Sequence, residues 1–191
     1  MAVEIEAKMK VANFDEIRAK LTSVGATKTG EYFEINTFFD TKDRSMLAAD
    51  QGLRLRVKRN DADNTETYVC TYKGPRQHGK LKSREEIEMS VVNPKDTVAF
   101  FAALGYEHVL TFEKRRHSWK FQRCFIELDE LPHLGVYIEI EGPDETTVFR
   151  IREALGLNNA PIIKTSYTAM LMNYLQERGR PDRSVMFPMD A

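Results

Sequence analysis

The chain has 191 residues, enough for one domain with a substantial core. Charged residues make up 30% of it, yet 28 lysines and arginines nearly cancel 29 aspartates and glutamates, leaving a net charge of −1. This balance argues against a general binder of nucleic acids or membrane surfaces, because both partners require a basic excess.

Alternation of apolar and polar residues predicts eight strands, and helical spacing of apolar residues predicts four helices. The first strand is VEIEAKMKV at residues 3–11. The other strands are expected at residues 31–40, 52–59, 67–73, 81–91, 110–120, 123–131 and 135–142. The helices are expected from Asn13 to Gly25, from Asn93 to Gly105, from Asp144 to Gly156 and from Ser166 to Glu177.

These elements predict one domain over residues 1–178. Residues 179–191 contain two prolines and no periodicity, so we expect a mobile C-terminal tail. Cys70 and Cys124 lack metal-ligand spacing, which predicts reduced thiols and a cytoplasmic protein. We also expect no membrane segment, because no signal region or long apolar run is present.

Charges gather on one face of several predicted strands, often with a single sign. Arg54, Arg56 and Lys58 share one face of their strand, whereas Glu139 and Glu141 share a face of the last strand. A solvated face usually mixes signs, because like charges on next-but-one positions repel one another. Acidic rows opposite basic rows indicate a mainly antiparallel eight-stranded barrel, an α+β fold whose charged interior is a tunnel and whose outer faces are covered by helices.

Such an interior has a definite chemistry. Converging carboxylates raise one another's pKa unless a cation compensates them, and oxygen ligands without a His or Cys cluster favour Mg²⁺ or Mn²⁺. Lysines and arginines on the opposite side would hold a polyanion. Metal-side acids and phosphate-side bases together describe a site for a phosphate chain.

Several motifs resemble one family, the CYTH superfamily of triphosphate tunnel metalloenzymes. ExExK stands at Glu4, Glu6 and Lys8, and ordered landmarks follow it: RLR, TYKGP, REEIE, FEKRR, ELDELPHLGVYIEIE and KTSY. Within the superfamily the chain is most similar to class IV adenylate cyclases, which resemble it in the LD-x-x-x-x-LG-x-x-x-E-I-E run. The resemblance covers nearly the whole chain, to about Tyr174.

The resemblance implies roles for particular residues. The implied metal ligands are Glu4, Glu6, Asp129, Glu139 and Glu141. The implied substrate-binding residues are Lys8, Arg54, Arg56, Lys73, Arg84, Lys114 and Arg116. Glu4, Glu6, Lys8 and Lys114 are the implied catalytic residues, while the roles of Glu86, Glu88, Lys82 and Lys164 stay open. Glu86 and Glu88 would be metal-side acids or would orient neighbouring bases, and Glu127 lies outside the landmarks, so we expect it to be structural.

Three functions remain open, of which we favour the first. A cyclase would convert ATP to cyclic AMP and pyrophosphate, and a phosphohydrolase would cleave inorganic, thiamine or nucleoside triphosphates in the same tunnel. A non-catalytic polyphosphate or nucleotide binder would not need every acid. The expected partner is therefore a small-molecule triphosphate, with no nucleic acid and no membrane, and the resemblance suggests a homodimer.

Overall fold

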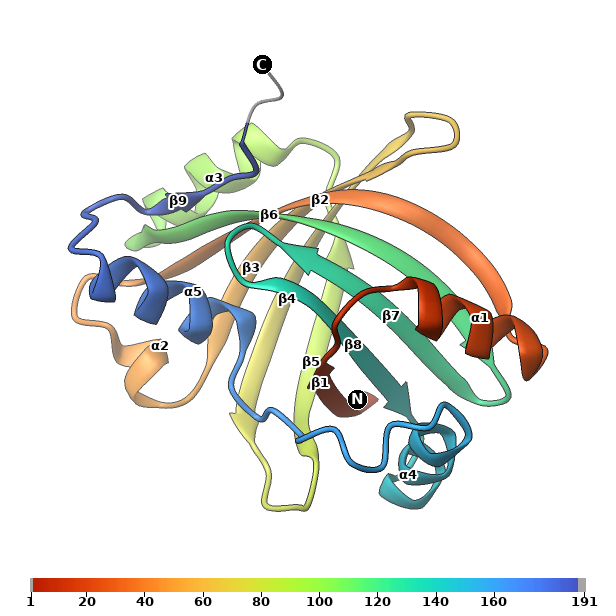
Figure 1. Cartoon of the computed structure of the whole chain (residues 1–191). Coiled ribbons are helices and arrows are strands. Elements are labelled where there is room, and N and C mark those ends of the chain that lie inside the picture. The colour runs from red at the N-terminus through yellow and green to blue at the C-terminus, as the bar shows by residue number, and fades with distance from the viewer. Residues whose placement is uncertain (1, 189–191) are drawn as a thin grey trace.

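The structure is a computed structural model that describes residues 2–188, and its eight long strands close into a barrel (Figure 1). Neighbours follow the order β2-β3-β4-β5-β1-β8-β7-β6, all antiparallel, and pairing of β2 with β6 closes the ring. The strands are β1 (Ala2–Lys10), β2 (Thr27–Thr41), β3 (Gly52–Asn60), β4 (Glu66–Arg76), β5 (Lys82–Ser90), β6 (Tyr106–Phe121), β7 (Cys124–Leu131) and β8 (Gly135–Gly142). The predicted α+β barrel of eight mainly antiparallel strands is confirmed.

Strands β2 and β6 extend furthest beyond the ranges that their sequence patterns indicated. β2 and β6 pair with each other from Thr27 opposite Lys120 to Thr41 opposite Tyr106, with register shifts near Gly30 and Phe39. Ladder hydrogen bonds along this pair extend both strands past the segments where apolar and polar residues alternate.

The four predicted helices are present as α1 (Asp15–Ser23), α3 (Pro94–Ala103), α4 (Glu145–Ala154) and α5 (Tyr167–Glu177). The side chains of Asn13, Asn93, Asp144 and Ser166 accept hydrogen bonds from backbone N–H groups in the first turns of these helices, as their residue types predicted. A fifth helix, α2 (Ser45–Ala48), was not expected. It is a single turn held by the carboxylate of Asp40, which accepts from the N–H groups of the second and third helix residues.

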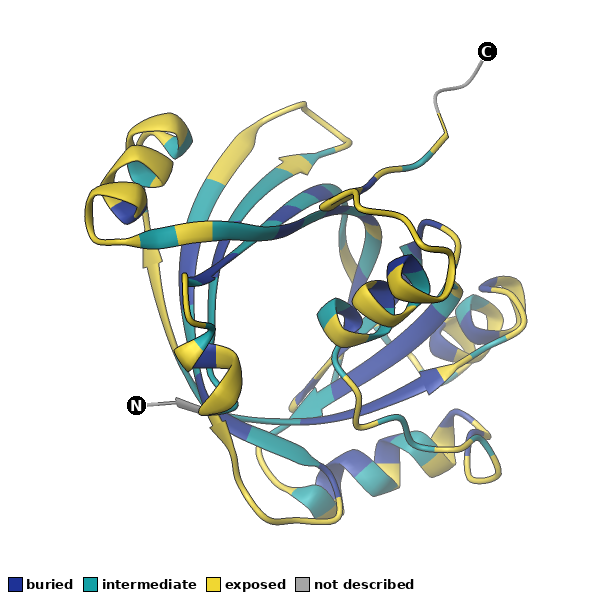
Figure 2. Ribbon diagram, turned by 90° about the vertical axis from the view of Figure 1, so that its left-hand side faces the viewer, coloured by how far each residue is buried: buried dark blue, intermediate teal, exposed yellow. Residues whose placement is uncertain are grey.

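Helices α1 and α4 cover the outer face of the barrel, where Figure 2 shows each helix with a buried side and an exposed side. Their apolar side chains pack on the outward residues of β1, β7 and β8. This core includes Met9, Ile126, Ile138 and Ile140 of the barrel, Ile17 and Leu21 of α1, and Val148 and Ile151 of α4. On another side, Phe101 of α3 packs against Phe39, Leu55 and Cys70.

Helix α5 takes a different position from the outer cover that we expected of all four helices. It packs in a second core with Phe112, Leu131 and Tyr137. These three residues have the same strand parity as Lys114, Asp129 and Glu139, so they point to the inner side of the barrel. Helix α5 therefore fills one end of the interior.

Part of the expected tail lies on the barrel. β9 (Ser184–Val185) pairs in parallel with Thr111 and Phe112, next to α5 (Figure 1). β7 pairs with β6 only from Arg115 onward, so the preceding edge of β6 is available to another strand. Val185 is buried there, and residues 189–191 of the expected tail lie outside the described residues.

Within residues 2–188, no helix has the length and apolar character needed to cross a membrane.

Candidate active site

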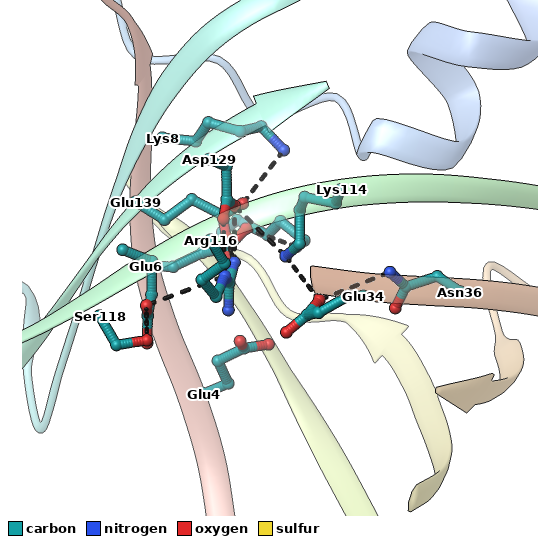
Figure 3. A network of polar contacts seen from close by, with 12 residues as sticks. Glu4, Glu6, Lys8, Glu34, Asn36, Lys114, Arg116, Ser118, Asp129 and Glu139 are labelled. Atoms are coloured by element: carbon teal, nitrogen blue, oxygen red, sulfur yellow. Dashed lines mark hydrogen bonds and ion pairs between the residues drawn. The ribbon is translucent and has the colours of Figure 1, made fainter. Parts of the chain in front are cut away.

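Each of the eight strands contributes charged side chains to the barrel interior, and Figure 3 shows a central part of this array. Side chains alternate between the two faces of a strand, so closure of the sheet turns one face of every strand toward the same space. The interior array includes Glu4, Glu6, Lys8, Glu34, Arg54, Arg56, Lys73, Lys82, Glu86, Lys114, Arg116, Asp129, Glu139 and Glu141.

Arg116 is the centre of the best-connected group in this array. Its Nε and Nη2 atoms donate to the two carboxylate oxygens of Asp129, each over 2.6 Å, and Nη2 also donates to Glu139 over 2.7 Å. Lys8 approaches the other oxygen of Glu139 at 3.6 Å. Burial would raise the pKa of Glu139, but Lys8 and Arg116 outweigh it and lower that pKa. Glu139 is therefore ionised, and both carboxylates are held by bases.

Glu34 is a central residue of the interior that the sequence did not single out. It is fully buried, with Oε2 3.1 Å from Lys114 Nζ and 3.2 Å from Arg56 Nε. Burial opposes ionisation, yet Arg56 and Lys114 hold the pKa of Glu34 well below its usual value. In the sequence, Glu34 and Asn36 alternate with apolar neighbours, which is typical of a strand. One charged residue does not form a row of like charges, so this pattern did not mark Glu34 as an interior residue.

Glu127 is also inside the barrel, rather than serving only the structural role that we expected. It accepts a hydrogen bond from Ser118 Oγ over 2.5 Å and lies 3.8 Å from Arg116 Nε. Burial raises its pKa. Its parity with Asp129 was the sequence signal for this inward position.

Strands β4 and β5 place the residues whose roles were open. Glu86 accepts a hydrogen bond from Lys73, and Glu88 accepts one from Arg54 Nη2 over 3.2 Å. Both acids thus contact bases in this structure. Burial and the nearby Arg54 lower the pKa of Lys73 to about 8.

The remaining expected residues lie toward the edges of the array. Lys82 donates to Glu6 over 2.5 Å. Arg84 is buried and lies 3.6 Å from Asp50, which is half-exposed and also pairs with Arg76. Lys164 does not join the interior: it is exposed and donates to the Gly79 carbonyl over 2.9 Å.

The interior carboxylates form two groups that differ in how available they are to a metal ion. Among residues 2–188, no three His, Cys, Asp or Glu side chains stand ready around one point for a cation. Asp129 and Glu139 are occupied by Arg116, but Glu4, Glu6 and Glu141 lie close enough to affect one another's ionisation. Burial, Glu4 and Glu6 raise the pKa of Glu141 to about 7, and burial raises the pKa of Glu4 and Glu6. Carboxylate oxygens are the donors that a hard divalent cation prefers, and such a cation bound by these three groups would relieve their repulsion.

Several interior side chains have a buried polar atom that lacks a hydrogen-bond partner among the described residues. They are Oε2 of Glu4, Oε1 of Glu34, Nε of Arg54, Nε of Arg84 and Oη of Tyr167. Buried polar groups are nearly always paired, so these acceptors and donors are available to a ligand that enters the interior.

A closed antiparallel barrel with a charged interior defines a tunnel-type protein. The chain belongs to the CYTH domain family, which matches residues 2–167. It is 26% identical over 174 residues to a Methanocaldococcus jannaschii protein named "Putative adenylate cyclase", covering 86% of this chain and 96% of that protein.

Two solved structures share the fold. The PH1819 protein of Pyrococcus horikoshii is 26% identical, with a TM-score of 0.78 over 90% of this chain and 99% of that one. A Hippeastrum adenylyl cyclase homologue, described as having a dominant triphosphatase activity, is 16% identical, with a TM-score of 0.64 over 94% of this chain and 97% of that one. At 16% identity the likeness concerns the fold.

Proposed function

We propose that this protein is a divalent-metal-dependent enzyme that acts on the triphosphate chain of ATP and forms cyclic AMP and pyrophosphate. The observation that carries the proposal is the buried array of bases around Arg116, Lys114 and Arg56, placed opposite the carboxylates of Glu4, Glu6 and Glu141. The name of the Methanocaldococcus relative supports the cyclase reaction.

Binding exchanges one set of ion pairs for another. In the ligand-free protein the bases are neutralised by Glu34, Asp129 and Glu139. An incoming triphosphate offers its oxygens to the same guanidinium and ammonium groups, with the arginines as bidentate donors. These groups are already dehydrated and oriented, but their contacts with the three carboxylates have to give way to the phosphate oxygens.

Mg²⁺ or Mn²⁺ held by Glu4, Glu6 and Glu141 would neutralise phosphate charge and lower the pKa of the ribose 3′ hydroxyl. In the reaction the 3′ oxygen bonds to the α-phosphorus, and the bond from that phosphorus to the bridging β oxygen breaks. The hydroxyl proton leaves to a general base or to water as the new bond forms. Arg116 and Lys114 stabilise the departing pyrophosphate.

A pocket beside the interior supports a nucleotide as the substrate. It has a volume of about 220 Å³ and is lined by Tyr32, Lys58, Asn60, Thr65 and Thr67. Lys58 continues the inner row of Arg54 and Arg56 along β3, so the pocket adjoins the basic row. Its hydroxyl, amide and aromatic groups suit the nucleoside end of a triphosphate better than another phosphate.

Hydrolysis of a triphosphate is the second candidate, because the Hippeastrum protein with the same fold is described as mainly a triphosphatase. Purified protein should be incubated with ATP, tripolyphosphate or thiamine triphosphate, each with Mg²⁺ and with Mn²⁺, and the products separated by chromatography. We expect cyclic AMP with pyrophosphate, and faster turnover of ATP than of tripolyphosphate. Release of orthophosphate without cyclic AMP would contradict the cyclase proposal and support the hydrolase. Absence of turnover would favour a non-catalytic binder.

A further inference from the structure

The hydroxyl group of Tyr167 is buried in the charged interior without a hydrogen bond. Tyr167 is the first residue of α5, the helix that fills one end of the barrel. The residue is 8% exposed, and its Oη has no hydrogen-bond partner among the described residues. An unpaired buried hydroxyl is unfavourable, so an acceptor is missing from its surroundings.

Contacts on several sides hold the Tyr167 ring in place. Lys8 Nζ lies 4.1 Å from the ring centroid, and the Tyr137 ring packs against it edge-to-face at 5.4 Å. Just before α5, the N–H of Ile163 donates to the carbonyl of Lys8 over 2.8 Å, and the Ser166 side chain caps the helix. The start of the helix is thus tied to β1, next to the ring of Tyr167.

The charges around Tyr167 make its hydroxyl a neutral donor. Burial and the carboxylates of Glu139 and Asp129 raise the pKa of Tyr167 well above its usual value, so the phenol keeps its proton. The ammonium groups of Lys8 and Lys114 also lie over the Tyr167 ring, 4.1 and 5.8 Å from its centroid. A buried, protonated hydroxyl in the neighbourhood of two cations can donate to an anionic oxygen that these cations attract.

We propose that Tyr167 is a further substrate-binding residue, whose hydroxyl donates a hydrogen bond to a phosphoryl oxygen of the bound triphosphate. The proposal rests on the function proposed above, because it places the same polyanion beside Lys8 and Lys114. A phosphoryl oxygen is favoured over a ribose hydroxyl because Lys8 and Lys114, which lie over the Tyr167 ring, attract negative charge. Helix α5 thereby contributes a donor that no barrel strand supplies.

The test compares Tyr167→Phe with Tyr137→Phe by isothermal titration with tripolyphosphate and with ATP, each with Mg²⁺ and with EDTA. Both variants keep an aromatic ring in the same cluster, but the Tyr137 hydroxyl already donates weakly to the Leu134 carbonyl over 3.4 Å. A hydrogen bond to a charged oxygen predicts affinity for both ligands at least about 10-fold weaker in Tyr167→Phe. Tyr137→Phe should stay within about twofold.

Thermal unfolding of the ligand-free variants separates binding from structure. Removing an unpaired hydroxyl should leave the melting temperature of Tyr167→Phe unchanged or higher. A lower melting temperature with unchanged affinity would assign the hydroxyl a structural role, and a loss confined to ATP would assign it to the nucleoside; either result overturns the proposal. If the wild-type protein and Tyr167→Phe bind tripolyphosphate equally, this inference alone fails. If the wild type binds neither ligand, the proposed function fails with it.

Discussion

Lys114 Nζ lies 3.1 Å from Glu34 Oε2, and the two residues stand directly opposite one another on the paired strands β6 and β2. The side chain of Glu34 is 0% exposed and that of Lys114 is 3% exposed, so this ion pair is sealed from water. A phosphate that binds Lys114 therefore has to compete with a carboxylate already in place. The pair links stability of the ligand-free barrel to ligand binding.

Replacing Glu34 by Gln should destabilise the ligand-free protein by about 3 kcal/mol, because Lys114 and Arg56 lose their buried counter-charge. Tripolyphosphate should restore more of the melting temperature in Glu34→Gln than it adds to the wild type. Thermal unfolding with and without the ligand measures both effects. The control is Glu31→Gln on the same strand, a partly exposed partner of Lys28 that is expected to change stability by less than about 1 kcal/mol. A ligand-induced gain no larger than that of the wild type would contradict the competition.

Arg56→Ala should weaken tripolyphosphate binding by about 10-fold or more, and Arg56→Lys should recover only part of the loss. The guanidinium is held by Asn36 over 2.9 Å and by Glu34, and a lysine cannot reproduce its two-pronged donation. Arg59→Ala on the same strand is the control, because its side chain is 44% exposed on the other face. Equal affinities of Arg56→Ala and Arg59→Ala in calorimetric titration would remove β3 from the binding site.

Lys73 should make ligand binding depend on pH near 8. Burial and Arg54 lower its pKa to about 8, so the ammonium that would hold a phosphate is lost as pH rises through 8. In the unfolded chain the pKa returns to about 10.5. Between these values the folded state binds fewer protons, and the contribution of Lys73 to stability increases as pH rises from 8 to 10.5.

Titrations at pH 7 and pH 9 check this expectation for Lys73. The fall in tripolyphosphate affinity should be smaller in Lys73→Gln than in the wild type and in Lys95→Gln, an exposed lysine of α3 that serves as the control. Any pH dependence that comes from titration of the ligand itself is the same in the control variant, so the comparison with the control removes it. The same pH dependence in all three proteins would show that Lys73 does not titrate in this range.

Glu4→Gln and Glu6→Gln should each lower turnover by about 100-fold or more, and folding should stay nearly intact in Glu4→Gln. Burial raises the pKa of both carboxyl groups, so neutral amides remove the cost of the charged forms, but Glu6→Gln also takes the buried carboxylate partner from Lys82 and should lose some stability. The expected contribution of both residues to turnover is to hold the metal. Activity with saturating Mg²⁺ or Mn²⁺ and thermal unfolding should be measured together, with exposed Glu16→Gln as the control. Wild-type turnover in either variant would remove β1 from the metal site.

The sequence by itself determined the eight long strands, four of the five helices and the inward direction of most charged rows. These properties depend on local periods: two residues for a strand, 3.6 for a helix, and a capping side chain at a helix start. Glu4, Glu6 and Lys8, for example, share a face of β1 whatever lies opposite them. Charge of one sign along a face then indicated an enclosed interior.

Only the tertiary structure decided which of these charges meet. Glu34 became central because β2 closes the barrel against β6, and Glu127 entered the interior beside Ser118. Tyr167 reached Lys8 because α5 packs into one end of the barrel and not on its outside. The alternation of residues along a strand sets a side chain's face, but the partner across that face depends on pairing register and barrel closure between segments distant in the chain.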